Sequence, residues 1–343
     1  MWRTVYVVVL SFAFAVVNVS QGIAAITIAT VPVGNPGNLA DPAAGFPEVG
    51  SVGYNYSIGE YDVTVGQYTA FLNAVAATDT YGLYNPSMAT DLNVAGIAQN
   101  GTAGNYSYSV IGSPNHPITY VSWGDAARFT NWLANDQPNG AEGPGTTETG
   151  SYTLNGATTI ADLNAVLRNA NATWVIPTEN EWYKAAYYNP ATNSYNLYPY
   201  SLPPGVFGPH SAPPGNSPAS GNFISPGGGY AVTGSSIYIS TQNYLTDVGA
   251  YTASASSYGA YDMGGDVFDW NETLVESVEG WRGDAGTPWD YPIARVYEPP
   301  PLYGARPTSE FDDAGFRVAL VPEPSTLALL GLGAVGLLLR RRC

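Results

Sequence analysis

Apolar residues recur at helical spacing in three segments of the chain, residues 61–79, 121–138 and 174–190, and each segment opens with the same pattern. Threonine or serine stands at the predicted N-cap, and glutamine, aspartate or glutamate follows three residues later, which predicts a capping box. The predicted boxes pair Thr64 with Gln67, Ser122 with Asp125, and Thr178 with Glu181. The predicted buried positions are Val65, Tyr68, Leu72, Val75, Trp123, Ala126, Phe129, Leu133, Trp182, Ala185 and Ala186.

Regular patterns are sparse in the rest of the chain. The stretch "SYTL" at 151–154 predicts a short strand, residues 159–170 a short helix, and "GFRVAL" at 315–320 a closing strand. Residues 196–247 are rich in glycine, proline and serine, which predicts mostly loop. We therefore expect one α+β body with little regular secondary structure.

The N-terminal end has the pattern of a secretory signal peptide. Arg3 precedes the apolar run "VYVVVLSFAFAVV", and the small residues "GIAA" follow it. This order predicts a signal peptide over residues 1–25, cut near Ala24 or Ala25, whereas a membrane anchor would lack the small residues so soon after the apolar run. We expect the protein to be exported.

The C-terminal end predicts a second targeting segment over residues 321–343. Pro322 and Pro324 stop any preceding element, and an apolar run at 326–339 leads to three arginines at 340–342. The run is shorter than the roughly 20 residues that span a bilayer alone, and terminal arginines suit the cytoplasmic side of a membrane. We expect a short transmembrane segment that acts as a transient membrane tether.

Charge and composition exclude several classes of protein. The formal net charge of −16 would repel phosphate backbones, so nucleic acid is not an expected partner. The only cysteine is Cys343, which excludes an internal disulfide, a cysteine nucleophile in the body and a thiolate metal site. The chain has two histidines, too few for a zinc or iron site built on several of them.

Six sequence blocks, in order, resemble the formylglycine-generating enzyme or sulfatase-modifying factor family. They are "EYDVTVGQYTAFLNAV", "HPITYVSWGDAARFTNWLA", "WVIPTENEWYKAAYY", "YGAYDMGGDVFDWNE", "RGD" and "GFRVAL". The resemblance implies a C-type-lectin-like fold over residues 26–320. The tail, with "PEP" at 322–324, resembles the PEP-CTERM sorting tail of bacterial exported proteins, which implies an exosortase-type sorting machinery as partner and a place in the cell envelope or outside the cell.

The same comparison with the family indicates that formylglycine formation is not expected here. Formylglycine formation in the family uses a copper-binding cysteine pair between the "RGG" and "GFR" blocks. The matching interval here, 282–317, contains no cysteine, so neither that activity nor a copper site is expected. A second branch of the family uses iron held by several histidines, which this chain also lacks.

The stretch "YGAYDMGGDVFDW" at 258–270 places carboxylates among aromatic residues and glycines. Calcium takes six to eight oxygens from carboxylates and carbonyls, and glycines let a loop turn its carbonyls inward. The resemblance implies a structural calcium site made by the side chains of Asp262 and Asp269 and the carbonyls of Gly265 and Val267. Two alternatives stay open, namely that the aspartates cap turns or form a catalytic pair.

Two further sites are implied by the resemblance. A second calcium site would use Asn222 and the carbonyl of Phe223. A ligand groove would include Trp281, Arg282 and Trp289, because aromatic residues beside an arginine suit binding. The acids of the same interval, Asp284, Asp290, Asp312 and Asp313, are expected to be solvated surface residues, with a catalytic role as the alternative.

These observations predict an exported, calcium-stabilised, lectin-like protein that binds a polysaccharide or a protein of the envelope or the extracellular space. No catalytic residue is predicted. The alternative is an oxidoreductase of the family that works without cysteines, and a third possibility is a structural matrix protein with no saturable ligand.

Overall fold

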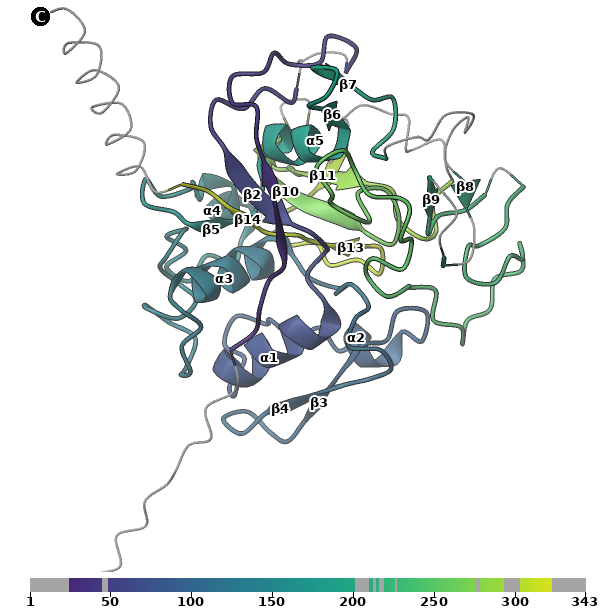
Figure 1. Ribbon diagram of the computed structural model, residues 1–343. Coiled ribbons are helices and arrows are strands. Elements are labelled where there is room, and N and C mark those ends of the chain that lie inside the picture. The colour runs from purple at the N-terminus through teal and green to yellow at the C-terminus, as the bar shows by residue number, and fades with distance from the viewer. Residues whose placement is uncertain are drawn as a thin grey trace, which may run out of the picture.

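The computed structural model describes residues 25–44, 49–200, 210–211, 214–215, 219–225, 227–275, 278–292 and 303–322. Short helices surround two small sheets, and long irregular segments connect them (Figure 1). The predicted signal peptide lies outside these residues apart from Ala25, and so does nearly all of the predicted tail. Over the described residues no helix has the length and apolar character to cross a membrane, and the expected tether at 326–339 is not among them.

The three predicted helices are confirmed, each with its capping box. They are α1 (Val65–Val75), α3 (Trp123–Ala134) and α5 (Glu179–Tyr187). In each box the cap side chain accepts from the third helical N–H, and the third side chain accepts from the cap N–H, so two otherwise unpaired donors are satisfied. Two shorter helices, α2 (Ser87–Thr90) and α4 (Ile160–Ala165), complete the described set.

The predicted strand at 151–154 is wrong. Tyr152 forms only an isolated bridge with Arg168, because a side chain satisfies its backbone instead of a neighbouring strand. The amide of Asn131 on α3 accepts from the Tyr152 N–H at 2.8 Å and donates to the Tyr152 carbonyl at 3.0 Å. The helix expected at 159–170 ends early, since Val166 is extended with ψ of 127°.

Two four-stranded sheets form the centre of the molecule. The first has the order β1-β2-β14-β5 and the second the order β12-β11-β10-β13, while three two-stranded pairs lie apart from them. The strands are β1 (Thr30–Val33), β2 (Tyr56–Gly59), β3 (Ile97–Asn100), β4 (Ser107–Val110), β5 (Trp174–Val175), β6 (Tyr188–Asn189), β7 (Ser194–Tyr195), β8 (His210–Ser211), β9 (Ser220–Gly221), β10 (Phe268–Leu274), β11 (Arg282–Gly286), β12 (Gly304–Ala305), β13 (Ala314–Gly315) and β14 (Ala319–Leu320). The described part of 196–247 is mostly loop, as predicted.

The "GFRVAL" segment links the two central sheets instead of forming one closing strand. Its first residue belongs to β13, which pairs in parallel with β10, and its end is β14, which pairs with β2 and β5. Gly315 is required at the crossing, because a Cβ there would lie 2.4 Å from the Ile118 carbonyl oxygen. Between the strands, Arg317 is fully buried.

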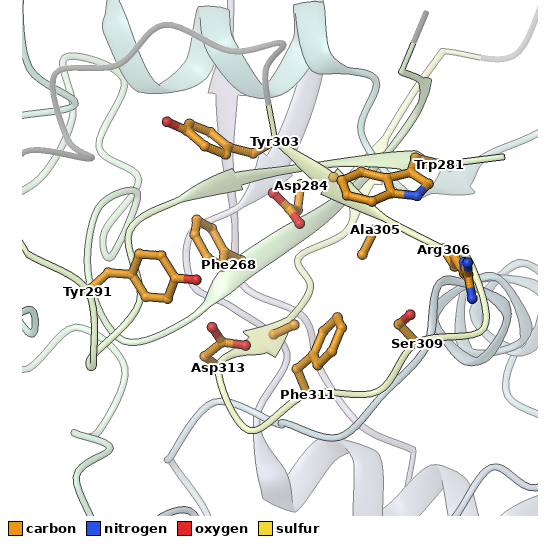
Figure 2. Close-up of a pocket in the computed structure, with 12 residues that line it drawn as sticks. Phe268, Trp281, Asp284, Tyr291, Tyr303, Ala305, Arg306, Ser309, Phe311 and Asp313 are labelled. Atoms are coloured by element: carbon orange, nitrogen blue, oxygen red, sulfur yellow. The ribbon is translucent and has the colours of Figure 1, made fainter. Parts of the chain in front are cut away.

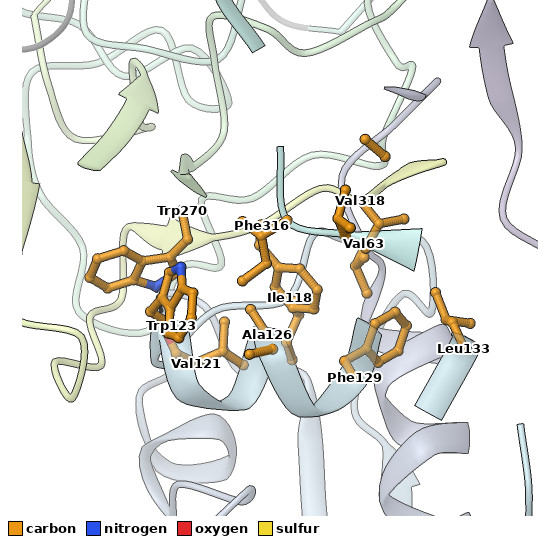
Figure 3. Close-up of a cluster of buried hydrophobic side chains, with 14 of the residues drawn as sticks. Val63, Ile118, Val121, Trp123, Ala126, Phe129, Leu133, Trp270, Phe316 and Val318 are labelled. Carbon is orange, nitrogen blue, oxygen red and sulfur yellow. Dashed lines mark hydrogen bonds between the residues drawn. The ribbon is translucent and has the colours of Figure 1, made fainter. Parts of the chain in front are cut away.

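Helix α3 packs its apolar face on this crossing segment (Figure 3). Phe129 lies edge-on to Phe316 with ring centroids 5.3 Å apart, and it stacks near Tyr68 of α1 at 6.1 Å. Aromatic pairs of this kind add about 0.5–1.5 kcal/mol beyond area burial. The predicted apolar positions of the three helices are all buried and form one core.

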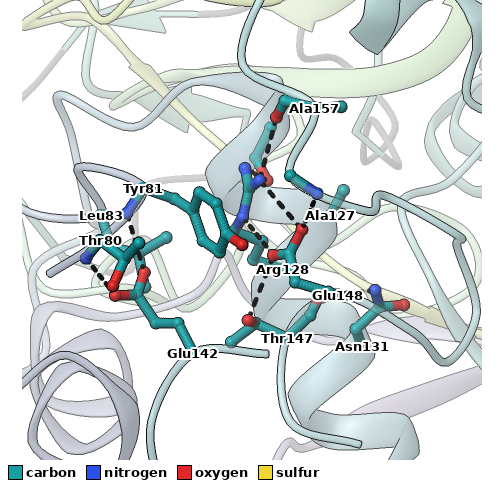
Figure 4. A network of polar contacts seen from close by, with 12 residues as sticks. Thr80, Tyr81, Leu83, Ala127, Arg128, Asn131, Glu142, Thr147, Glu148 and Ala157 are labelled. Carbon is teal, nitrogen blue, oxygen red and sulfur yellow. Dashed lines mark hydrogen bonds and ion pairs between the residues drawn. The ribbon is translucent and has the colours of Figure 1, made fainter. Parts of the chain in front are cut away.

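An ion pair fixes the irregular segment after α3 (Figure 4). Arg128 and Glu148 are both 2 % exposed, and Nε of Arg128 donates to Oε1 of Glu148 at 2.7 Å. The guanidinium also donates to the Ala157 carbonyl at 2.9 Å and lies 4.4 Å from the ring centre of Tyr81. Glu148 in turn accepts from the Gly156 N–H at 2.6 Å. This buried ion pair therefore fixes the irregular backbone around Gly156 and Ala157 to helix α3.

Candidate functional site

The predicted calcium loop folds back on the segment that contains Asn222. Asp262 and Asp266 have φ angles of 55° and 63°, in the left-handed region that aspartate tolerates better than most residues. Gly265 has φ of 147°, and a Cβ there would lie 2.8 Å from the backbone nitrogen of Asn222. The glycine is therefore needed for both the turn and the close approach of the two segments.

Asp269 lies on β10 in a buried ion-pair cluster. Its Oδ2 accepts from Nε of Arg317 at 2.6 Å and from the indole N–H of Trp182 at 2.8 Å. Arg317 also donates to Asp62, so one guanidinium serves two buried carboxylates. Within the described residues, Oδ1 of Asp269 and Oδ2 of Asp62 are buried and have no hydrogen-bond partner.

The cluster holds more negative charge than its arginine neutralises. Burial raises the pKa of Asp262 to about 6, and the N–H of Gly249, which donates to its Oδ2 at 2.6 Å, opposes the rise. Burial also raises the pKa of Asp62 well above its usual range, against the opposing effect of Arg317. An additional cation would therefore lower the electrostatic cost of these carboxylates.

One oxygen of the predicted calcium donors, Oδ1 of Asp269, has no hydrogen-bond partner among the described residues. Oδ2 of Asp262 accepts a hydrogen bond from the Gly249 N–H. Among the backbone donors of the described ranges, the Gly265 carbonyl accepts only the Val267 N–H, at 2.8 Å. No three His, Cys, Asp or Glu side chains of the described ranges converge as metal ligands. A cation bound here would depend on carbonyl oxygens for part of its shell, which is usual for calcium.

The residues of the predicted second calcium site lie beside this loop. The Asn222 amide donates to the Tyr244 carbonyl and to Oδ1 of Asp266, each at 2.7 Å. Asp266 also accepts from the N–H and the hydroxyl of Thr246 at 2.8 and 2.6 Å, and burial raises its pKa to about 7. The Phe223 ring is fully buried. Sequence reasoning missed this Asn222–Asp266 link, because only the fold brings the two segments together.

The three predicted groove residues separate in the structure. Arg282 is 1 % exposed, donates to the carbonyls of Leu163 and Val166 at 2.8 and 2.7 Å, and lies 4.0 Å from the ring centre of Trp123. Trp289 is 3 % exposed and stacks on Tyr244 with centroids 4.9 Å apart. Both side chains are packed in the interior of the described body, and of the three residues Trp281 is the one that lines the pocket described next.

That pocket, of about 460 Å³, lies between the second sheet and the segment that precedes β13 (Figure 2). Aromatic rings and two carboxylates dominate its lining. The residues are Phe268, Trp281, Asp284, Tyr291, Tyr303, Gly304, Ala305, Arg306, Ser309, Phe311, Asp313 and Ala314. Concave sites with apolar walls and a few polar groups are typical of ligand binding.

The acids of this interval are less exposed than solvated surface residues usually are. Asp284, Asp290, Asp312 and Asp313 are all partly buried. Burial and Asp313 raise the pKa of Asp290 to about 7, and burial and Asp312 raise that of Asp313 to about 6. Pairing of β10 with β13 brings these acids together, and no local sequence pattern encodes that pairing. The number of acids within residues 282–317 is the one sequence feature that could have indicated the cluster.

The described residues form an α+β body, in which one C-terminal segment joins two central sheets, three capped helices surround them and loops line a pocket. The model of the sulfatase-modifying factor enzyme 1-like domain matches residues 26–321. The chain belongs to this family. The model of the PEP-CTERM protein-sorting motif matches residues 320–342, which implies exosortase-type sorting and export to the bacterial cell envelope. No curated protein matches the chain.

Several solved structures are similar to this chain. The structure described as CarF has a TM-score of 0.51 at 20% sequence identity, covering 86% of this chain and 99% of its own. Treponema denticola variable protein 1 gives a TM-score of 0.49 at 14% identity, covering 88% and 97%, and PvdO from Pseudomonas aeruginosa gives 0.44 at 18% identity, covering 86% and 92%. At 20% identity the likeness to CarF concerns the fold alone.

Proposed function

We propose that this protein is an exported, calcium-stabilised, lectin-like domain that binds a saccharide of an envelope or extracellular polysaccharide. The observation that carries the proposal is the pocket of about 460 Å³, in which aromatic rings and carboxylates face the same space. Flat rings offer apolar contact area to a sugar face, and carboxylates accept hydrogen bonds from sugar hydroxyls. Binding rather than formylglycine formation is proposed because residues 282–317 contain no cysteine.

Calcium has a supporting role in this proposal. The expected ligands are the side chains of Asp262 and Asp269 with the carbonyls of Gly265 and Val267. Phe268 lies between two of these ligands, Val267 and Asp269, and its side chain lines the pocket. An ion that orders residues 262–269 would hold one wall of the pocket in place, and a ligand that binds only the folded state also stabilises the body as a whole.

Binding is tested with the mature body, residues 26–320, on glycan arrays and by titration calorimetry of the strongest hits. Phe311→Ala removes a ring that is 44 % exposed and lines the pocket, so it should weaken binding at least several-fold with little change in melting temperature. Leu197→Ala, at a site 68 % exposed and outside the pocket lining, is the matched control. Equal affinity of both variants would place the binding surface elsewhere, and no saturable binding would leave a structural matrix role.

A further inference from the structure

We propose that this protein binds a glycan chain of several sugar units and that the exposed ring of Tyr238 stacks on a unit that lies outside the pocket. This inference rests on the proposed function, since it adds a second contact for the same kind of ligand. The observation that carries it is a set of stacked aromatic rings that connects the wall of the pocket to the surface of the molecule.

The rings of Trp289 and Tyr238 both stack on Tyr244. The centroids of Trp289 and Tyr244 are 4.9 Å apart with an angle of 5° between the ring planes, and those of Tyr244 and Tyr238 are 6.0 Å apart with an angle of 12°. Trp289 and Tyr244 are 3 % and 1 % exposed, whereas Tyr238 is 53 % exposed. Since Tyr244 covers one face of the Tyr238 ring, the other face and the ring edge supply the exposed area and are accessible to a ligand.

Hydrogen bonds hold Tyr238 in place before any ligand binds. Its hydroxyl donates to Oδ1 of Asn93, and the same amide group donates to the carbonyls of Ile239 and Gln242 at 2.9 and 2.8 Å. The Ile239 N–H donates to the Tyr244 hydroxyl at 2.9 Å. Because the ring is already oriented, stacking on it loses little of the side-chain entropy that a flexible contact would lose.

The inner end of the stack is fixed to the wall of the pocket. The indole N–H of Trp289 donates to the carbonyl of Asp312 at 3.3 Å. Asp312 stands between Phe311 and Asp313 in the chain, and both of these residues line the pocket. Tyr291, two residues after Trp289, lines it as well (Figure 2). A glycan seated in the pocket is therefore close to the stack, and a few more sugar units can extend it to Tyr238.

The surface around Tyr238 suits a sugar ring better than a protein partner. Ile237 and Ile239, on either side of Tyr238, are 70 % and 44 % exposed. Three apolar side chains provide far less than the roughly 800 Å² per partner that a stable protein interface buries. They match the C–H face of a single pyranose unit, because the partial negative charge of an aromatic face attracts polarised C–H groups. The exposed hydroxyls of Ser236 and Ser240 can exchange hydrogen bonds with sugar hydroxyls.

Stacking and charge together limit the class of glycan. In β-1,4-linked chains of glucose or N-acetylglucosamine the ring substituents are equatorial, so each unit presents a flat C–H face to an aromatic ring. An anionic glycan would be repelled by a protein with a formal net charge of −16. The expected ligand is therefore a neutral β-1,4-linked pyranose chain.

The test uses β-1,4-linked oligomers of glucose and of N-acetylglucosamine, each with two, four and six units, in titration calorimetry with the mature body. For at least one series we expect the hexasaccharide to bind about tenfold more tightly than the disaccharide. Tyr238→Ala should bring these two affinities within about twofold of each other, whereas Tyr238→Phe keeps the ring and should keep the dependence on length. Phe311→Ala should weaken both lengths alike. Leu197→Ala, at an exposed site outside the pocket lining, is the control.

The outcomes separate this inference from the proposed function. A wild-type affinity that is independent of length, or an unchanged dependence on length in Tyr238→Ala, would overturn the stacking site and leave binding in the pocket. Loss of the dependence in a folded Tyr238→Phe variant would overturn it as well, since the ring is kept. If both series fail while another glycan of the array binds saturably, the inferred class of glycan is wrong and the proposed function stands. If no glycan binds, both are refuted.

Discussion

The buried Arg128–Glu148 pair offers a direct test of how this fold is held together. Glu148→Gln keeps the shape of the side chain but removes its charge, so the guanidinium of Arg128 stays buried without a counter-ion. Breaking a buried pair by removing one partner typically costs about 3–5 kcal/mol of unfolding free energy. Arg128 keeps the Ala157 carbonyl and the Tyr81 ring, so we expect a loss of about 3 kcal/mol.

Replacing both partners should be less damaging than replacing one. In Arg128→Met/Glu148→Leu no charge remains buried, and two apolar side chains of similar length fill the space. Buried ion pairs exchanged for apolar residues are often near neutral, so at least half of the single-variant loss should be recovered. A surface control is Asp247→Asn, whose partner His116 lies 3.7 Å away and whose side chain is 49 % exposed, and it should cost under about 1 kcal/mol.

Urea denaturation of residues 26–320, followed by tryptophan fluorescence, measures these differences as shifts in the transition midpoint at constant slope. Reversibility is checked by refolding from urea. The reasoning is refuted if Glu148→Gln costs less than about 1 kcal/mol, or if the double variant is less stable than the single one. Either result would mean that water or chain rearrangement compensates the guanidinium.

Three further outcomes follow from the same structure. EDTA should lower the melting temperature of the body, because a cation that binds only the folded state stabilises it. Asp269→Ala should abolish most of this EDTA-dependent shift, even if the substitution itself changes the stability. An unchanged melting temperature with EDTA would favour the turn-capping interpretation of the loop. Burial raises the pKa of Glu179 from 4.5 to about 7, so the folded state binds this proton more tightly than the unfolded state. The free energy of unfolding therefore falls as the pH rises from about 4.5 to above 7. Glu179→Gln should therefore flatten this part of the melting-temperature profile and raise stability at pH 8, whereas parallel profiles would contradict the assignment. Gly265→Ala should weaken the fold by more than 1 kcal/mol, as φ of 147° is strained for alanine, and an unaltered urea midpoint would show that the loop relaxes.

Local chemistry made the helices predictable. A cap residue and its partner three positions later satisfy backbone groups within one turn, so Thr64, Ser122 and Thr178 marked their helices without tertiary information. The glycines of 258–270 likewise indicated a tight loop. The strand expected at 151–154 was wrong because an Asn131 side chain from a distant helix competes for its backbone, a contact that no window of residues contains.

The sequence by itself determined the family, the targeting motif at the C-terminus, the three capped helices and the absence of a cysteine pair, because each depends on residue types and short spacings. Only the tertiary structure decided which of the remaining residues pack in the core, form ion pairs or line the pocket. It buried Arg282 and Trp289 in packing, set Arg317 between Asp62 and Asp269, and gathered the rings of the pocket from segments between residues 268 and 314. Sheet pairing fixes these neighbours, and pairing between distant strands depends on the whole chain.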